Sequence, residues 1–80
     1  MPMSDADFWR VFSRAMGRAV APGSYTPAQL PEWDSLRHVE MIFELEDSFK
    51  IQIPPDAIAD LFSDTDTVLA FLRAKLALAP

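Results

Sequence analysis

Asp34, Ser35 and His38 are the side chains of this sequence that could do chemistry together. A carboxylate, a histidine and a serine are the components of a nucleophilic triad, and Ser35 and His38 would be neighbours on a helix because of their i, i+3 spacing. Asp34 and Ser35 are adjacent, so they point in different directions and a relay through His38 is geometrically poor. Nothing in the sequence marks an oxyanion hole. An ester hydrolase, whose turnover would be lost in His38→Ala, is therefore the weakest interpretation.

Ser35 has two further interpretations, and both depend on a helix that begins near residue 34 or 35. The first amide hydrogens of a helix lack partners, so Asp34 or Ser35 could simply be the N-cap. A helix N-terminus also favours negative charge, so a serine there could carry a phosphodiester whose charge the helix partly compensates. The tripeptide Asp34-Ser35-Leu36 is common and leaves both roles open.

The helix that would position Ser35 is apolar on two nearly opposite faces. It should end near Phe49 or Lys50, where two prolines follow. At about 100° per residue, the wider apolar face is the predicted core stripe. This face consists of His38, Met41, Ile42, Leu45 and Phe49.

The narrower face of this helix consists of Leu36, Val39 and Phe43. Acidic residues flank it at Glu40, Glu46 and Asp47, and Glu44 lies further round. An exposed apolar surface with acids along its sides is typical of a partner-docking surface. The alternative is that Trp33 and the preceding loop fold over this face and bury it.

The remaining segments predict helices around this one. Ser4 and Asp7 resemble a capping box ahead of a helical run. Its buried face is predicted to be Phe8, Val11, Phe12, Ala15 and Ala19, and its solvated face to be Arg10, Arg14 and Arg18. Residues 21–33 hold three prolines and a glycine. They are therefore expected to form a long loop, pinned to the core by Leu30, Trp33 and Tyr25.

Two more helices are predicted in the last third of the chain. Residues 55–62 can form a short helix, with Ile58, Leu61 and Phe62 turned inward. Residues 67–78 read as the last helix, and its inward residues are Val68, Phe71, Leu72 and Leu76. The prediction is therefore an all-α fold, in which residues 1–80 form one small bundle of three longer helices and a short third helix.

Composition removes several classes of function. Twelve acidic and seven basic residues give a net charge of −5, which disfavours nucleic-acid and membrane-surface roles and favours basic protein partners. The absence of cysteine excludes disulfides and thiolate sites, and a single histidine argues against a metal site. No segment approaches the length of a membrane span, and Asp5 and Asp7 argue against a targeting peptide. We expect a cytoplasmic monomer without membrane insertion.

A longer pattern around Ser35 is far more specific than the tripeptide. It consists of Asp34, Ser35, Leu36, Val39, Glu40, Ile42, Leu45, Glu46, Phe49, Ile51 or Ile53, and Pro54. With this pattern, residues 33–54 resemble the acyl carrier proteins, which are small acidic helical domains that carry acyl groups on phosphopantetheine. The likeness continues more weakly over residues 67–72, and the helix order, the long first loop and the acidity agree with it.

The resemblance implies that Ser35, preceded by Asp34, is the attachment point of a 4'-phosphopantetheine arm. A phosphopantetheinyl transferase would supply the arm from coenzyme A, and its thiol would hold substrates as thioesters. The protein would be a carrier and not itself an enzyme. Its partners would be a loading ligase or transferase and enzymes of fatty-acid, lipid or polyketide-type biosynthesis with basic docking patches. The resemblance assigns partner binding to Leu36, Val39, Glu40, Phe43, Glu46 and Asp47.

Three features depart from the family pattern. Pro31-Glu32-Trp33 stands where a glycine is usual, Arg37 replaces an acid of the fatty-acid carriers, and residues 54–68 form a longer connection. These departures suggest a specialised stand-alone carrier. Aminoacyl, aryl and peptidyl loads stay open, as does a helical protein-interaction module without a prosthetic group. In the family an acyl chain can lie inside the bundle, which here would involve core positions such as Met41, Leu45, Phe49, Ile53, Ile58, Leu61 and Phe71.

Overall fold

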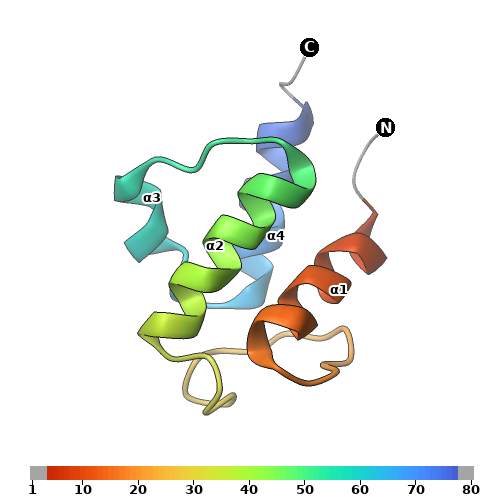
Figure 1. Cartoon of the computed structure of the whole chain (residues 1–80), viewed down its shortest axis with the longest axis vertical. Helices are drawn as coiled ribbons and strands as arrows, with labels where there is room; N and C mark the ends of the chain where they lie inside the picture. Colours follow the sequence, from red (N-terminus) through yellow and green to blue (C-terminus); the bar gives the residue numbers. More distant parts are fainter. Residues whose placement is uncertain (1–3, 78–80) are drawn as a thin grey trace.

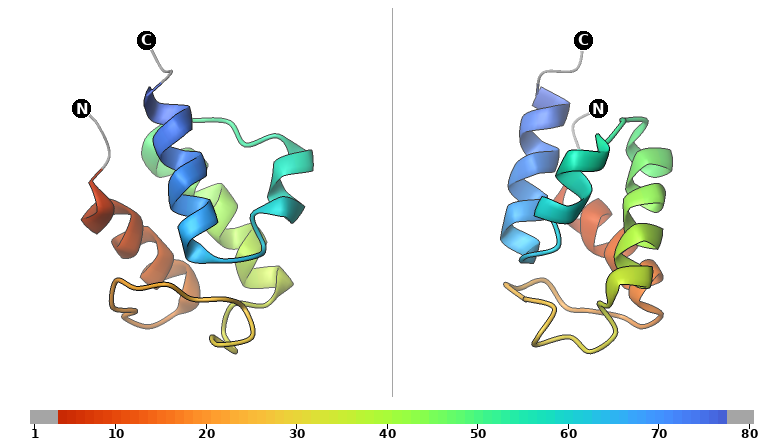
Figure 2. Two further views of the ribbon diagram at one scale, coloured as in Figure 1. Left: turned by 180° about the vertical axis from the view of Figure 1, so that it is seen from behind. Right: turned by 90° about the vertical axis from the view of Figure 1, so that its left-hand side faces the viewer.

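The computed structural model describes residues 4–77, which form helices and loops without a β-strand. The helices are α1 (Asp5–Met16), α2 (Ser35–Phe49), α3 (Pro55–Asp60) and α4 (Thr65–Ala77). In Figure 1, α1 and α3 lie on opposite sides of α2, and α4 lies behind α2. The two further views in Figure 2 show the same arrangement from behind and from the side. The predicted all-α bundle with a short third helix is confirmed.

The start of α1 follows the predicted capping box. The Ser4 hydroxyl accepts a hydrogen bond from the Asp7 amide at 3.2 Å, and the Asp7 carboxylate accepts one from the Ser4 amide at 3.2 Å. These two bonds satisfy donors that the first turn would otherwise leave unpaired. The local pattern S-x-x-D was therefore sufficient to locate this end of the helix.

The end of α1 was predicted incorrectly. Ala19, which we expected on the buried face, lies beyond the helix and is exposed, whereas Val20 is buried. The helix stops at Met16 because Gly17 adopts a left-handed conformation with φ of 81°, and its amide donates to the carbonyls of Ser13 and Arg14. Arg18 consequently lies outside the helix as well.

Gly17→Ala is expected to lower the free energy of unfolding by about 1–2 kcal/mol, because a side chain disfavours the left-handed conformation. A Cβ at this position would also lie 2.7 Å from Nη1 of Arg37, which would have to move. Urea denaturation followed by circular dichroism measures the change. Gly17→Asn adds the same Cβ but tolerates this conformation better, so it should lose less stability. Equal losses in the two variants would contradict the conformational explanation.

The long first loop is tied to the rest of the bundle at both ends. Leu30 and Trp33 are buried and Tyr25 packs against the core, as predicted. Buried Thr65, at the start of α4, accepts a hydrogen bond from the Tyr25 amide at 3.0 Å and donates one to the Gly23 carbonyl at 3.1 Å. This contact joins residues about 40 positions apart, and sequence reasoning assigned no role to Thr65.

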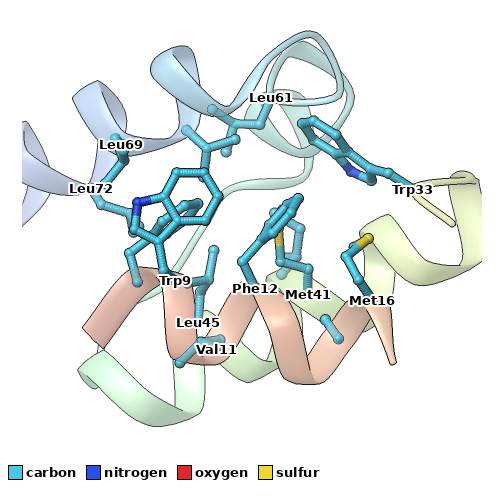
Figure 3. Packing of buried hydrophobic residues seen from close by; sticks show 14 of the residues in the cluster. Trp9, Val11, Phe12, Met16, Trp33, Met41, Leu45, Leu61, Leu69 and Leu72 are labelled. Carbon is cyan, nitrogen blue, oxygen red and sulfur yellow. The ribbon is translucent and has the colours of Figure 1, made fainter. Parts of the chain in front are cut away.

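The core is one apolar cluster drawn from every part of the fold. Figure 3 shows side chains from α1, α2 and α4 meeting in this cluster, with Trp33 at one end of it. Its least exposed large members are Trp33, Phe8, Phe12, Met16, Met41, Ile42, Leu45 and Leu72. The predicted core stripe of α2 is confirmed: His38, Met41, Ile42 and Leu45 are buried, and Phe49 is half-buried and packs against the cluster.

The last two helices differ slightly from their predicted bounds. α3 ends at Asp60, and the following Leu61 is buried while Ile58 and Phe62 are half-buried against the core. α4 begins at Thr65, two residues earlier than predicted, because the Asp64 carboxylate accepts a hydrogen bond from the Thr67 amide at 2.6 Å and caps the helix.

The inward face of α4 agrees with the prediction. Val68 and Leu72 are buried, and Phe71 and Leu76 are half-buried. Leu78, the last residue of the predicted helix, lies outside the described residues. Over residues 4–77, no helix combines the length and the apolar character that crossing a membrane would require.

Candidate functional site

Asp34, and not Ser35, caps α2. The Asp34 carboxylate accepts a hydrogen bond from the Arg37 amide at 2.9 Å, and its carbonyl accepts one from the His38 amide at 2.9 Å. Ser35 is the first residue of the helix and is exposed. The hydroxyl of Ser35 is therefore not needed as the cap, and it faces solvent at the positively polarised end of α2.

Backbone hydrogen bonds hold the residues that precede Ser35 in place. The Trp33 amide donates to the Leu30 carbonyl at 2.9 Å, and the Asp34 amide donates to the Glu32 carbonyl at 2.9 Å. Glu32 also forms an ion pair with Arg18, whose hydrogen bond to Glu32 lowers the pKa of that carboxyl. Trp33 is thus held by burial in the core, and Glu32 is held by its ion pair with Arg18. Both residues directly before Asp34 are therefore fixed by contacts with other parts of the chain.

His38 joins the loop, α2 and α3 through both ring nitrogens. Its Nδ1 accepts a hydrogen bond from the indole Nε1 of Trp33 at 3.0 Å. Nε2 must then carry the proton of the neutral ring, and it donates to the Ile58 carbonyl at 2.6 Å. We call this set of contacts the Trp33–His38–Ile58 bridge. His38 is only 3% exposed, so the bridge lies inside the fold.

The bridge bears directly on the hydrolase interpretation. A general base for Ser35 needs a ring nitrogen within hydrogen-bond reach of the hydroxyl. Both nitrogens of His38 are used by Trp33 and Ile58, and Asp34 is used by the helix cap. Asp34 and His38 therefore have separate structural roles at the start of α2, and neither is available to activate Ser35.

Stability is expected to fall as the pH drops below about 6.5, because the folded state resists protonation of His38. Burial lowers the pKa of His38 below its ordinary value of 6.5, although the hydrogen bond to Ile58 opposes this shift. Below that value the unfolded chain binds a proton that the folded chain does not. The loss should therefore begin near the ordinary pKa of histidine and continue until the folded form also titrates.

Urea denaturation at about pH 7.5 and pH 5.5 measures this effect on either side of the histidine pKa. His38→Gln, which cannot titrate, should show little change over that interval. The carboxyls whose pKa values are lowered, Asp7, Glu32 and Asp64, have ordinary values of 3.8 or 4.5 and contribute at lower pH. An equal loss in His38→Gln would show that another group is responsible.

Arg37 is the basic residue that replaces an acid of the fatty-acid carriers in the pattern around Ser35. It packs against α1. Its Nη1 donates to the Ala15 carbonyl at 3.2 Å, in the last turn of α1, and the guanidinium lies over Gly17. A cation at this position also complements the negative end of the α1 dipole. Arg37 thereby links the end of α1 to the start of α2, which sequence reasoning did not anticipate.

The narrower apolar face of α2 is exposed. Leu36 is 67% exposed, Phe43 is 61% exposed and Val39 is 38% exposed, and we call these three residues the exposed strip. The alternative, in which Trp33 and the loop cover this face, is wrong because Trp33 is buried in the core at 1% exposure. The exposed strip begins at the residue next to Ser35.

The acidic residues near the exposed strip have different surroundings. Glu40 and Asp47 are exposed, and together with Phe43 and Glu44 they line a shallow depression whose other wall is Arg14 and Ala15 of α1. Arg14 and Glu44 form an ion pair at 3.4 Å. The predicted partner-binding residues Leu36, Val39, Glu40, Phe43 and Asp47 are thus all at the surface of one helix.

Glu46, the sixth predicted partner-binding residue, has a structural contact of its own. Its carboxylate accepts a hydrogen bond from the Ile53 amide at 2.8 Å, and the side chain is half-buried. Glu46 therefore holds the connection between α2 and α3 against the end of α2. Arg14 was predicted to lie on a solvated face, and it is exposed. It lines the edge of the depression because α1 packs against α2.

Comparisons with known proteins identified no relative of this chain. No protein-family model matches the chain, and neither a curated protein nor a solved structure matches it significantly. Among residues 4–77, no group of three or more histidine, aspartate or glutamate side chains could hold a metal ion.

Proposed function

We propose that this protein is an acyl carrier protein, in which the hydroxyl of Ser35 bears a 4'-phosphopantetheine arm. The observation that carries the proposal is the exposure of Ser35 at the first position of α2, where Asp34 already provides the cap. A serine in this position is not needed to stabilise the helix. Its hydroxyl is accessible to a modifying enzyme, and it stands beside the exposed strip.

The surroundings of Ser35 fit a phosphodiester. The free amides and the dipole at the start of α2 favour a negative group there. Ser35 itself is exposed, so a modifying enzyme can reach it. Arg37 is directed toward Ala15 of α1, so its contribution to the site is structural. Ser35 would hold the arm covalently, and the arm would supply a thiol that forms thioesters.

The modification would be a transfer of the phosphopantetheine group from coenzyme A to Ser35. Oγ of Ser35 would attack the phosphorus of coenzyme A that bears the pantetheine, forming the new O–P bond. The pyrophosphate bond breaks, and adenosine 3',5'-bisphosphate leaves with its electron pair. The proton of the serine hydroxyl goes to a base of the phosphopantetheinyl transferase. This chain contributes the nucleophilic oxygen and its fixed position.

Partner enzymes would dock on the exposed strip and the acids beside it. A net charge of −5 and the exposed carboxylates of Glu40 and Asp47 favour surfaces with basic patches. Such electrostatic encounters are fast and weakened by salt, which suits a carrier that visits a transferase, a loading ligase and biosynthetic enzymes in turn. The load would be an acyl group, with an aminoacyl, aryl or peptidyl group as the alternative.

Intact mass spectrometry tests the proposal. The protein is incubated with coenzyme A and a promiscuous phosphopantetheinyl transferase, and we expect a mass gain of one phosphopantetheine group. Ser35→Ala should show no gain. Ser48→Ala, which removes an exposed serine at the other end of α2, should be modified like the unaltered protein. The absence of a gain, or an equal gain in Ser35→Ala, would rule out the proposal.

The exposed strip also supports a second candidate, a helical protein-interaction module without a prosthetic group. The three apolar residues are accessible whether or not Ser35 is modified. In that case Ser35→Ala would keep the function of the protein and Leu36→Asp would abolish it. A carrier would lose its function in both variants, so a cellular complementation assay with these two variants separates the two candidates.

A further inference from the structure

A hydrogen bond joins α2 to α3 within one helical turn of Ser35. Ser35 and His38 lie at i, i+3 positions of α2, and the Trp33–His38–Ile58 bridge spans from the loop before α2 to the backbone of α3. Figure 1 shows α3 beside α2, on the side away from α1. An acyl group that entered the bundle at this end of the seam between α2 and α3 would have to pass this bridge.

Aromatic rings pack around the bridge on the core side. The ring of Phe62 lies 4.8 Å from the ring of His38 and 5.9 Å from that of Trp33, and the ring of Phe12 lies 5.3 Å from Trp33. Figure 3 shows the ring of Phe12 on the side of the core that faces Trp33. The bridge is therefore part of a packed layer of aromatic side chains.

Opening this seam would leave buried polar groups without partners. The indole N–H of Trp33 and the carbonyl of Ile58 would both lose their hydrogen bonds to His38, in a region where Trp33 and His38 are almost completely buried. Unpaired buried polar groups are strongly unfavourable. An apolar chain entering here would also have to displace the rings that pack against the bridge.

We propose that the Trp33–His38–Ile58 bridge keeps the load of the arm outside the bundle, and that the protein therefore carries acyl groups that tolerate water, namely short or polar ones. This inference rests on the proposed function of Ser35. A long alkyl chain gains from burial with every methylene, so a carrier whose α2–α3 seam is blocked beside Ser35 suits such a chain poorly. His38 acts here as a residue that determines specificity through its position, without touching the thioester.

The first test compares two loaded forms of the protein. The transferase installs the acetyl or the octanoyl arm from the corresponding acyl-coenzyme A, and the rate of thioester cleavage by hydroxylamine is measured by intact mass. We expect the two rates to agree within about twofold, because neither thioester is shielded from water. An octanoyl form protected by about tenfold or more would overturn the proposal, because the chain would then be sequestered.

Two bridge variants show whether the bridge is responsible. In His38→Ala, which removes both hydrogen bonds, we expect the octanoyl thioester to become protected while the acetyl thioester does not. His38→Leu also removes both hydrogen bonds but keeps an apolar side chain of similar volume, so it serves where His38→Ala fails to fold. Unchanged octanoyl cleavage in a folded variant of either kind would contradict a gating role. Protection in the unaltered protein that Phe43→Ala abolishes would place the chain on the exposed strip and would also overturn the proposal.

A second preparation separates the failure of this inference from the failure of the proposed function. If the transferase does not load Ser35, the proposed function fails, and an octyl chain can instead be attached to Ser35→Cys as a mixed disulfide. The indole N–H signal of Trp33 is then observed by NMR. With His38 in place, we expect this signal to stay at its position when the octyl group is attached. His38→Ala moves the signal by itself because it removes the acceptor of the indole N–H, so the octyl and octyl-free forms of that variant are compared, and we expect a further shift on attachment. A shift with His38 in place would show that the chain enters past the bridge.

Discussion

Trp33→Ala is expected to lower the free energy of unfolding by about 3–5 kcal/mol, the usual range for removing a large buried aromatic side chain. Trp33 is 1% exposed, packs edge-to-face on Phe12 at 5.3 Å and donates a hydrogen bond to His38. A domain of this size has a total stability of about 4–12 kcal/mol, so the loss would be a large part of it. Urea denaturation followed by far-UV circular dichroism measures the change.

Trp33→Phe is the matched control for this prediction. It keeps an aromatic ring in the core and removes the indole N–H, so it should lose clearly less stability than Trp33→Ala. If Trp33→Ala lost less than about 1 kcal/mol, the side chain could not be a buried core residue. The interpretation in which Trp33 lies over the exposed strip would then have to be considered again.

Leu36→Asp is expected to lower the efficiency of phosphopantetheine loading by about tenfold or more, because it places a carboxylate in an apolar contact directly beside the serine that the transferase must reach. Leu36 is next to Ser35 and is 67% exposed, so the change should leave the stability of the fold nearly unchanged. Loading rates at several concentrations of the carrier, followed by intact mass, give kcat/KM for the transferase.

Ala70→Asp provides the control for charge. It places the same new carboxylate at an exposed position of α4, away from the exposed strip, and should leave the loading efficiency within about twofold of the unaltered protein. If the two variants were loaded equally well, the exposed strip would not be the surface that the transferase recognises. Thermal unfolding of both variants confirms that any loss in loading is not a loss of structure.

The parts of the fold that local patterns specify were predicted well. The period of the apolar residues located α2 and its two faces, and both the buried stripe and the exposed strip agree with the structure. The capping box of Ser4 and Asp7 located the start of α1. These features depend on neighbours within about one turn, and such interactions can be read from the order of residues.

The end of α1 could not be predicted from the apolar periodicity. The apolar spacing continues to Ala19, but Gly17 can adopt the left-handed conformation, and Arg37 from α2 packs over it. A glycine permits this ending without requiring it, and the packing of α1 against α2 decides the outcome. The periodicity alone therefore predicted a helix that is too long.

The contacts that position the candidate site were the least predictable. His38 was expected in the core stripe of α2, but its hydrogen bonds to Trp33 and Ile58 follow from the way the loop and α3 meet α2. The bond between Thr65 and Tyr25 likewise joins segments far apart in the chain. Such contacts depend on tertiary geometry. The sequence indicated that Ser35 begins a helix, and the structure adds that Asp34 alone fills the role of the cap.

Mapping the modified residue would show whether Ser35 carries the phosphopantetheine group. The protein is produced together with a phosphopantetheinyl transferase and digested with trypsin, and the peptide of residues 19–37 is fragmented in a mass spectrometer. This peptide contains the hydroxyl groups of Ser24, Tyr25, Thr26 and Ser35. We expect the phosphopantetheine group on Ser35 and on none of the others. An unmodified peptide, or a group carried by another residue, would contradict the assignment of this protein as a carrier that uses Ser35.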